Sequence, residues 1–203
     1  MESYFELDEI SKDILEEIGN IGTGNAVTAL SSMIGGNFEV ELPKIQVANY
    51  RETPELLGGA EMVETGILLK LDGELSGMLM FLLDEDFTRK LLNALLGEQE
   101  RDLAAMDEMC KSALCEVGNI MCCSYINALA ELMAAKIHVS VPDMCCDMAG
   151  AILSVPMIHF ANLSDDLILI RNKFRTEQWA FVSHVLFLPE LESLEKILDT
   201  LGE

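Results

Sequence analysis

Apolar and polar positions recur along this chain with two different periods. A spacing of three to four residues, first seen in the isoleucines from position 10 to 21, predicts helices, and strict alternation predicts strands. The expected helices span residues 8–35, 84–96, 104–135, 143–155 and 189–201. The expected strands span residues 38–47, 65–71, 75–83, 137–141, 166–172 and 179–188.

Glycine and proline mark several borders of these elements. Gly35-Gly36 ends the first helix, and Asp72-Gly73 predicts a hairpin between the second and third strands. Pro43 suits an edge or a bend of the first strand, because proline has no N–H for a ladder. Pro189 suits the first turn of the last helix.

The beginning of the chain is repeated 99 residues later. Residues 14–21 align with residues 113–120 without a gap, and both segments contain Glu-x-Gly-Asn-Ile. Further matches at the same offset are Ala29-Leu30 with Ala128-Leu129, Val40 with Val139, and Pro43 with Pro142. An offset that holds through helix, turn and strand indicates an internal duplication.

The duplication predicts the architecture. We expect residues 1–203 to form a single domain of two repeats, about 8–97 and 104–202, with the hinge at 97–101. A few strands and a pair of helices seldom stand alone, so the repeats should share one sheet. The predicted fold class is α/β (α+β): a pseudo-two-fold duplication with a mainly antiparallel sheet covered by long helices.

Each long helix carries a line of polar residues. Asp13, Glu17 and Asn20 are four and three residues apart, which places them on one helical face, and Gly24 continues the line. The second helix repeats the line as Ser112, Glu116, Asn119 and Cys123. A single Glu-x-x-Asn is usually a solvated helix face, but two in equivalent places favour a functional site.

The residue types of this line limit the chemistry. Asparagine does not titrate near neutral pH, but its amide holds a water and a phosphoryl oxygen, as a glutamine does in some GTPases. Glutamate can act as a base or can anchor a cation of a partner. No metal cluster, Cys-His pair or Ser-His-Asp set accompanies them. A protein substrate that brings its own metal and reactive group fits this incomplete site.

Charge excludes some partners. The chain has 35 acidic and 13 basic residues, a net charge of −22, so nucleic acid and anionic membrane surfaces are poor partners. The acidity serves either docking to a basic surface or solubility. The apolar runs are strand-sized, so we expect no transmembrane span. The acidic N-terminus does not resemble a signal peptide, and we expect a cytoplasmic protein.

The cysteines predict neither a metal site nor a disulfide framework. They form no C-x-x-C pair, and the three histidines are not at zinc-ligand spacings from them. We interpret all six as core or near-surface residues in a reducing compartment. The cysteines are Cys110, Cys115, Cys122, Cys123, Cys145 and Cys146, and the histidines are His138, His159 and His184.

The doubled motif resembles a known family signature. Asp13-x3-Glu17-x2-Asn20-x22-Pro43 is similar to the pattern of the CheC family of chemotaxis phosphatases, which includes CheC, CheX and FliY. Ser112-x3-Glu116-x2-Asn119-x22-Pro142 is the second copy. The resemblance covers essentially the whole chain. Two motifs in one chain resemble CheC most, and no appended flagellar switch module is expected.

The resemblance implies dephosphorylation of phosphorylated CheY, a response regulator. Asn20 and Asn119 would orient the attacking water, and Glu17 and Glu116 would contact the regulator, through its active-site lysine. The regulator would supply Mg²⁺, so no cofactor of the chain itself is implied. CheD, a receptor deamidase, is the second implied partner. A monomer or a heterodimer is expected.

The surface for CheD has one candidate. The expected helix 143–155 is prominent only in the second repeat, and Asp147 is its most plausible polar contact. The alternative is a helix that covers the sheet, with Asp147 merely exposed.

Two further alternatives stay open. A non-catalytic adaptor would sequester CheD or the regulator without turnover, while a structural component of the flagellar switch is disfavoured. The two sites are also expected to be unequal. Gly22-Thr23-Gly24 stands beside Asn20, whereas Met121-Cys122-Cys123 stands beside Asn119.

Overall fold

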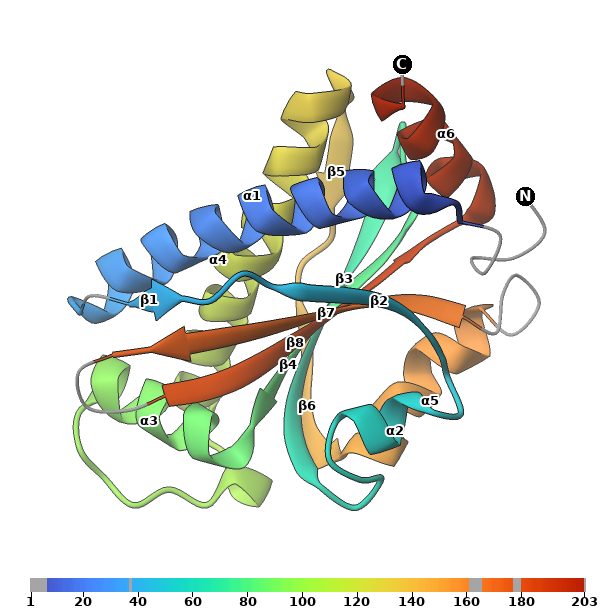
Figure 1. The fold of residues 1–203 in the computed structure, drawn as a ribbon. Coiled ribbons are helices and arrows are strands. Elements are labelled where there is room, and N and C mark those ends of the chain that lie inside the picture. The colour runs from blue at the N-terminus through green and yellow to red at the C-terminus, as the bar shows by residue number, and fades with distance from the viewer. Residues whose placement is uncertain (1–6, 37, 161–165, 177–179, 203) are drawn as a thin grey trace.

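The computed structural model describes residues 7–36, 38–160, 166–176 and 180–202, whose helices and strands are labelled in Figure 1. The helices are α1 (Glu9–Ile34), α2 (Thr53–Leu56), α3 (Glu85–Leu96), α4 (Glu108–Met133), α5 (Ala149–Phe160) and α6 (Leu191–Leu201). The strands are β1 (Glu39–Val40), β2 (Lys44–Asn49), β3 (Val63–Gly73), β4 (Gly77–Asp84), β5 (Ile137–Val139), β6 (Asp143–Met148), β7 (Asp166–Arg175) and β8 (Ala180–Pro189).

The strands form one antiparallel sheet in which the repeats exchange their edges. The order is β1-β7-β8-β4-β3-β5, with β2 also paired with β7 and β6 with β3. The first two strands of each repeat thus extend the hairpin of the other repeat, and the hairpins meet through β4 and β8. Since neither repeat completes its part of the sheet alone, we infer one domain of two repeats.

A bulge interrupts the first exchanged edge. Val40 lies opposite Phe174 and Lys44 opposite Arg171, so four steps along one strand meet three along its partner. Pro43 stands within the extra length, where no ladder N–H is required of it. The expected strand 38–47 is therefore two strands, with the bend at its proline.

The second exchanged edge carries the same bulge. Val139 lies opposite Leu71 and Asp143 opposite Leu68, again four steps against three, with Pro142 between. The proline of the doubled motif therefore marks an equivalent irregularity in both repeats.

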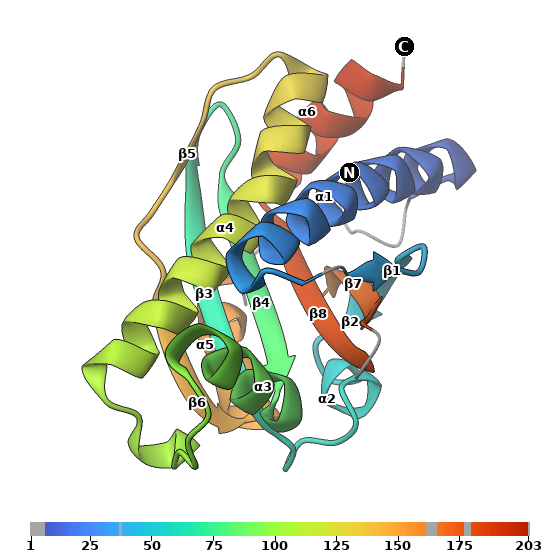
Figure 2. The ribbon, with the colours of Figure 1, turned by 90° about the vertical axis from the view of Figure 1, so that its left-hand side faces the viewer.

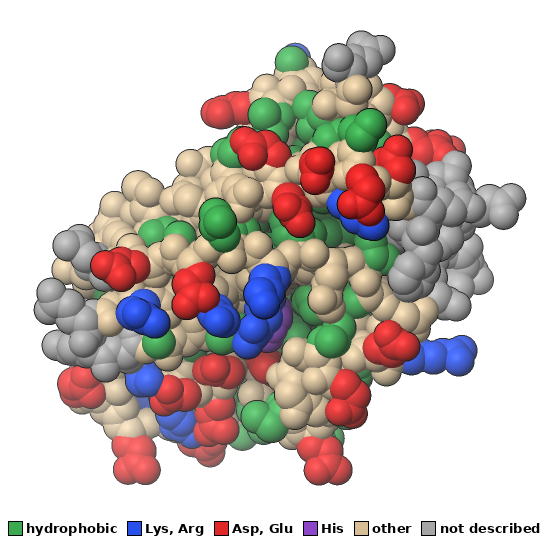
Figure 3. Space-filling model, viewed as in Figure 1, with side chains coloured by type: hydrophobic (Ala, Val, Ile, Leu, Met, Phe, Trp, Pro, Cys, Tyr) green, Lys and Arg blue, Asp and Glu red, His purple; other side chains and the backbone are tan. Residues whose placement is uncertain are grey.

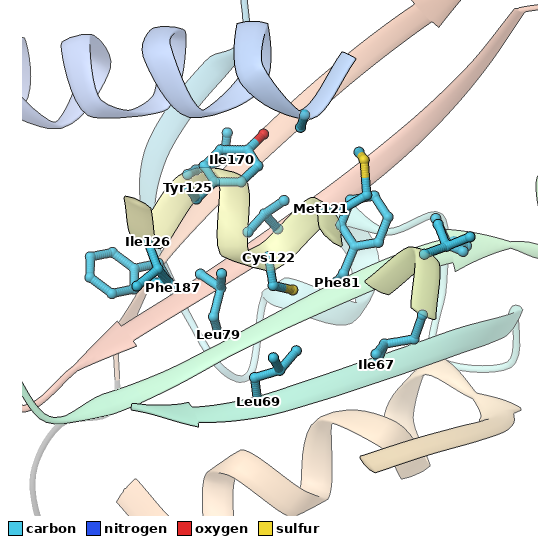
Figure 4. Close-up of a cluster of buried hydrophobic side chains, with 14 of the residues drawn as sticks. Ile67, Leu69, Leu79, Phe81, Met121, Cys122, Tyr125, Ile126, Ile170 and Phe187 are labelled. Carbon is cyan, nitrogen blue, oxygen red and sulfur yellow. The ribbon is translucent and has the colours of Figure 1, made fainter. Parts of the chain in front are cut away.

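Helices cover both faces of the sheet. The long helices α1 and α4 cross on one face, with α3 and α6 beside them, and α2 and α5 lie on the other (Figures 1 and 2). The larger core fills the space under the long helices. Figure 4 shows its centre, where Met121, Cys122 and Tyr125 of α4 lie above Leu79 and Phe81 of the sheet.

The two long helices are built alike. Each has 26 residues, and α4 begins and ends 99 positions after α1. Asp8 and Asp107 cap their N-termini, each accepting a backbone N–H three residues ahead at 2.8 Å. Both end on a left-handed residue, Gly35 with φ of 71° and Ala134 with φ of 49°.

The predicted fold class is confirmed, but some predicted elements are wrong. Residues 143–155 are not one helix: they begin as strand β6 against β3 and become helix α5 only at Ala149. The strand forms because the segment alternates exposed and half-buried side chains along an edge. The long helix of the second repeat begins at Glu108 rather than near 104, and the short helix α2 was not expected.

Two turn predictions also shift. The hairpin of β3 and β4 is present, but its loop is Glu74–Ser76, and Asp72-Gly73 closes the first strand. Pro189 ends β8, and Glu190 is the residue before the first turn of α6. Trp179, the expected start of the last strand, lies outside the described residues.

Helix α4 is apolar enough to pass a test for a membrane span, which the sequence analysis did not anticipate. Among the described helices it alone combines sufficient length with sufficient apolarity, with a mean hydropathy of 1.3 over its most apolar window, and 50% of that window is buried in the protein. Its apolar side lies on the sheet and on α1, which accounts for the hydropathy. A buried core helix passes the same test, so this is weak evidence for a span.

Candidate functional site

The two polar lines project from equivalent faces of α1 and α4. Glu17 and Glu116 are both exposed, and Asn20 and Asn119 are both half-buried. The first members of the lines, Asp13 and Ser112, are exposed as well. The structure therefore gives each motif an accessible carboxylate and, one turn on, an amide that reaches solvent from a more enclosed position.

The glycine inside each motif faces the sheet. A Cβ added at Gly19 would lie 2.3 Å from Cδ1 of Ile45, and one at Gly118 would lie 2.4 Å from Cγ2 of Ile67. At Gly118 the added Cβ would also lie 2.9 Å from Cβ of Ile67, so α4 needs glycine to lie this close to β3, whereas at Gly19 the end of the Ile45 side chain would have to shift. The Glu-x-Gly-Asn spacing thus turns glycine inward and the two polar residues outward.

The motif proline acts through the strand that follows it. Pro43 precedes Lys44 at the bulge, and the next residue, Ile45, is the side chain on which Gly19 rests. Pro43 is half-buried and lies in the sheet layer rather than on the helix face that carries Asn20. We therefore interpret Pro43 and Pro142 as scaffold residues of the motif.

A closed ring of buried hydrogen bonds fixes the crossing of the long helices. Thr23 Oγ1 donates to Asn172 Oδ1 at 2.9 Å, Asn172 Nδ2 donates to the Tyr125 hydroxyl at 2.9 Å, and that hydroxyl lies 2.8 Å from Thr23 Oγ1. All three side chains are buried. The ring joins α1, α4 and β7 just after the first motif, so each satisfied group rigidifies the helix that carries Asn20.

The two glycines that follow Asn20 have different roles. Gly22 is buried under Tyr125, whose Cδ1 would lie 2.3 Å from an added Cβ, so it does not open the polar face. Gly24 does open that face, because nothing lies within 4 Å of its added Cβ.

The equivalent position in the second repeat carries a thiol. Cys123 Sγ donates to Asn119 Oδ1 at 3.6 Å. Burial, and then Glu116, raise the pKa of the Cys123 thiol, which keeps its proton available for this bond. The two sites therefore differ at one position, which is Gly24 in the first repeat and Cys123 in the second. The other residues of Gly22-Thr23-Gly24 and Met121-Cys122-Cys123 are buried and do not change the polar face.

The surroundings of the motifs offer few other chemical groups. Five residues before each motif glutamate stands a lysine: Lys12 pairs with Glu9 at 2.9 Å and Lys111 with Glu108 at 3.4 Å, again 99 residues apart. Within the described ranges, no group of three or more His, Cys, Asp or Glu side chains is arranged to hold a metal ion. All six cysteines are free thiols. The carboxylate and the amide of each motif can bind and orient a substrate group.

Comparison with known proteins identifies the family. The family description "Chemotaxis phosphatase CheX" matches residues 65–158, and "CheC-like family" matches residues 10–45. The Bacillus subtilis (strain 168) protein named CheY-P phosphatase CheC is 30% identical over 200 residues, which are 97% of this chain and 96% of that protein. The chain belongs to the CheC family of chemotaxis phosphatases.

Solved structures place the fold of this CheC-family chain among flagellar and chemotaxis proteins. Thermotoga maritima FliY matches with a TM-score of 0.75 and 20% identity, covering 97% of this chain and 98% of that one. A chain of the FliM-SpeE complex from H. pylori matches with a TM-score of 0.73 and 12% identity, covering 97% and 96%. At these identities the likeness shows a shared fold.

Proposed function

We propose that this chain is a phosphatase that hydrolyses the aspartyl phosphate of a CheY-type response regulator. One observation carries the proposal: Glu-x-x-Asn occurs twice, on equivalent accessible faces of two helices that match in length, caps and offset. The support from relatives is the whole-length similarity to a CheY-P phosphatase.

Each asparagine would position the attacking water. Its carboxamide oxygen accepts a hydrogen bond from the water, and its amide group donates to a phosphoryl oxygen. The water oxygen then bonds to phosphorus as the bond from phosphorus to the aspartyl oxygen breaks, which yields a carboxylate and inorganic phosphate. Holding the water in line is a sufficient source of acceleration, because a well-placed reactant gains several kcal/mol (about 7–11 at most) over a free one.

Each glutamate would anchor the regulator. Glu17 and Glu116 are exposed at the edge of the motif. They are therefore better placed to form an ion pair with a lysine of the partner than to remove a proton from a buried water. The regulator would bring both Mg²⁺ and the phosphorylated aspartate. The chain then requires no cofactor of its own.

The test is the decay of phosphorylated CheY with purified chain. Asn20→Ala and Asn119→Ala should each lower the rate, and the double variant should lower it to that of the regulator alone. Asn25→Ala on α1 and Asn127→Ala on α4 are matched controls, because both asparagines are exposed on the same helices outside the motif. A double variant that retains the wild-type rate would show that the two asparagines are not the catalytic residues, and a wild-type chain that gives no acceleration even with CheD would overturn the phosphatase proposal.

The alternative is a non-catalytic adaptor that sequesters CheD or the regulator. The fold shared with a chain of the FliM-SpeE complex favours it, because that structure is a protein assembly. An adaptor would bind phosphorylated CheY and leave its decay rate unchanged, with or without CheD. A phosphatase would accelerate the decay at concentrations of chain below that of the regulator, since each molecule turns over.

Modulation by CheD is a further part of the proposal, and the structure moves its candidate contact. Asp147 is exposed on strand β6, opposite Glu64 of β3, rather than on a helix. The helix that follows, α5, exposes Val155, Met157 and Ile158. A surface of one carboxylate and several apolar side chains suits a protein partner.

Asp147→Asn tests this surface at constant shape. We expect weaker CheD binding by calorimetry and an unchanged basal rate of CheY-P decay. Asp143→Asn, an exposed aspartate at the other end of the same strand, is the control. Equal CheD affinity for wild type and Asp147→Asn would remove Asp147 from the interface.

A further inference from the structure

Two cations face each other on the sheet without a counter-charge. Lys44 of β2 lies directly opposite Arg171 of β7, so the two side chains share one face. Like charges in this register destabilise a strand pair. The chain has 35 carboxylate side chains and only 13 basic ones, yet neither residue has an ion pair among the described residues.

A third nitrogen-bearing side chain continues the row. His184 of β8 lies opposite Arg171, is 7% exposed, and its Nε2 has no hydrogen-bond partner in the described structure. Burial, and then the charge of Arg171, lower the pKa of His184 to about 4. The histidine is therefore neutral at neutral pH and leaves the two cations uncompensated.

A cavity lies where the two cations meet. Its volume is about 240 Å³, and Lys44, Gln46 and Arg171 line it together with Leu56 and Leu169. Figure 3 shows basic side chains near the middle of the view, over β2 and β7. Lys44 and Gln46 lie on the face of the sheet opposite α1. Side chains alternate along a strand, and Ile45, between these two residues, points toward Gly19 of α1.

The lining determines what fits. Two cations and an amide attract an oxyanion, and Arg can hold a carboxylate through two parallel hydrogen bonds. The leucines form an apolar side, and Leu56 is 43% exposed at the surface. A cavity smaller than the roughly 300 Å³ at which ligand pockets begin suits one side chain rather than a nucleotide.

We propose that this cavity, the Lys44–Arg171 pocket, binds a carboxylate side chain of a partner protein next to an apolar residue of that partner. The net charge of −22 repels free anions from the chain as a whole. An acidic segment that also buries an apolar side chain against Leu56 gains a contact that a free anion lacks. The pocket is independent of the Glu-x-x-Asn motifs, which lie on the helices of the other face.

The probe for the test is the dipeptide acetyl-Leu-Glu-amide, titrated into isotopically labelled chain and followed by backbone amide NMR. The chemical-shift changes that the dipeptide causes should be confined to β2, β7 and α2 of the chain. Binding of the dipeptide should become weaker as the salt concentration rises. The neutral acetyl-Leu-Gln-amide should bind at least fivefold more weakly. Inorganic phosphate, the third ligand, distinguishes a general anion site and should also bind more weakly than the acidic dipeptide.

The variants separate the pocket from net charge. Lys44→Gln/Arg171→Gln should lose the shifts, while Lys70→Gln/Lys136→Gln, the same charge change at exposed lysines elsewhere, should keep them. Because Lys44→Gln/Arg171→Gln removes a repulsive pair, the urea midpoint of this variant should be equal to or higher than that of wild type. Retained binding by the pocket variant, equal binding of the neutral dipeptide, tighter binding of phosphate, or no shift up to about 20 mM probe would each overturn the proposal.

Discussion

The thiol of Cys123 lies 3.6 Å from the carboxamide oxygen of Asn119, and the position equivalent to Cys123 in the first repeat is Gly24. The bond engages the carboxamide oxygen of Asn119 from one turn further along the same helix. Asn20, with open space at Gly24, has no such partner among the described side chains. The second site is thus more ordered before its substrate arrives.

This difference predicts a kinetic effect at one site, given the proposed phosphatase activity. In an Asn20→Ala background, which leaves only the second site, Cys123→Gly should lower the turnover of CheY-P about two- to fivefold. That range corresponds to the roughly 0.5–1 kcal/mol of a weak S–H···O bond. KM should stay the same, and Cys123→Ser, which keeps a donor, should restore most of the turnover.

The converse substitution supplies the control. Gly24→Ser in an Asn119→Ala background places a donor beside Asn20 and should raise turnover at the first site. If Cys123→Gly and Cys123→Ser have equal turnover, Cys123 does not position Asn119. If the wild-type chain does not accelerate decay, the phosphatase proposal itself fails, so the two outcomes are distinguishable.

A second prediction contrasts two glycines of one helix. Gly22→Ala should lower the free energy of unfolding by about 1–3 kcal/mol, because its Cβ would meet the buried ring of Tyr125 at 2.3 Å. Gly24→Ala should raise it by roughly 0.5–1 kcal/mol, since alanine favours a helix interior and nothing lies within 4 Å. Urea unfolding measures both. A loss of stability at position 24, or none at position 22, would contradict the packing of α1 on α4.

The sequence predicted the parts of the fold that repeat within the chain. The offset of 99 residues indicated that α1 and α4 are equivalent, because a glycine and the polar lines recur at matching positions, although α4 was expected to begin near 104 rather than at Glu108. It also placed Glu17, Asn20 and their second copies on accessible helix faces. These features depend on local spacing, which a sequence displays directly.

The features that the sequence did not predict depend on partners distant in the chain. The exchange of edge strands requires β2 to find β7 and β6 to find β3, and no local pattern encodes that choice. Asp147 was expected on a helix over residues 143–155, but pairing with β3 makes the first part of that segment a strand. The ring of Thr23, Tyr125 and Asn172 joins residues as many as 149 positions apart.

A third prediction concerns the ends of the long helices. Gly35 and Ala134 are equivalent left-handed caps, with φ of 71° and 49°, and alanine is strained there because of its Cβ. Ala134→Gly should raise the free energy of unfolding by about 1 kcal/mol, whereas Gly35→Ala should lower it by about as much. Thermal unfolding of the two variants tests this. Equal effects of the same sign would show that the two helix ends differ.

A last prediction gives the stability of the fold a pH dependence. Glu64 on β3 is 3% exposed and its Oε2 has no hydrogen-bond partner among the described residues. Burial, and then the nearby charge of Asp84, raise its pKa from the ordinary 4.5 to about 7. Between these values the unfolded chain releases this proton while the folded chain keeps it, so folding stability from this group falls as pH rises from about 4.5 to 7.

Glu64→Gln removes this titration and keeps the shape of the side chain. The variant should match wild type near pH 4 and should be more stable at pH 8, by roughly 3 kcal/mol at most, which is the full pKa difference as free energy. Urea unfolding at several pH values measures the gap. Glu61→Gln, an exposed neighbour on the approach to the same strand, should leave the pH profile of wild type unchanged. If the difference in free energy of unfolding between wild type and Glu64→Gln does not grow from pH 4 to pH 8, the folded state does not disfavour ionisation of Glu64. The Glu64 side chain would then not be buried as described.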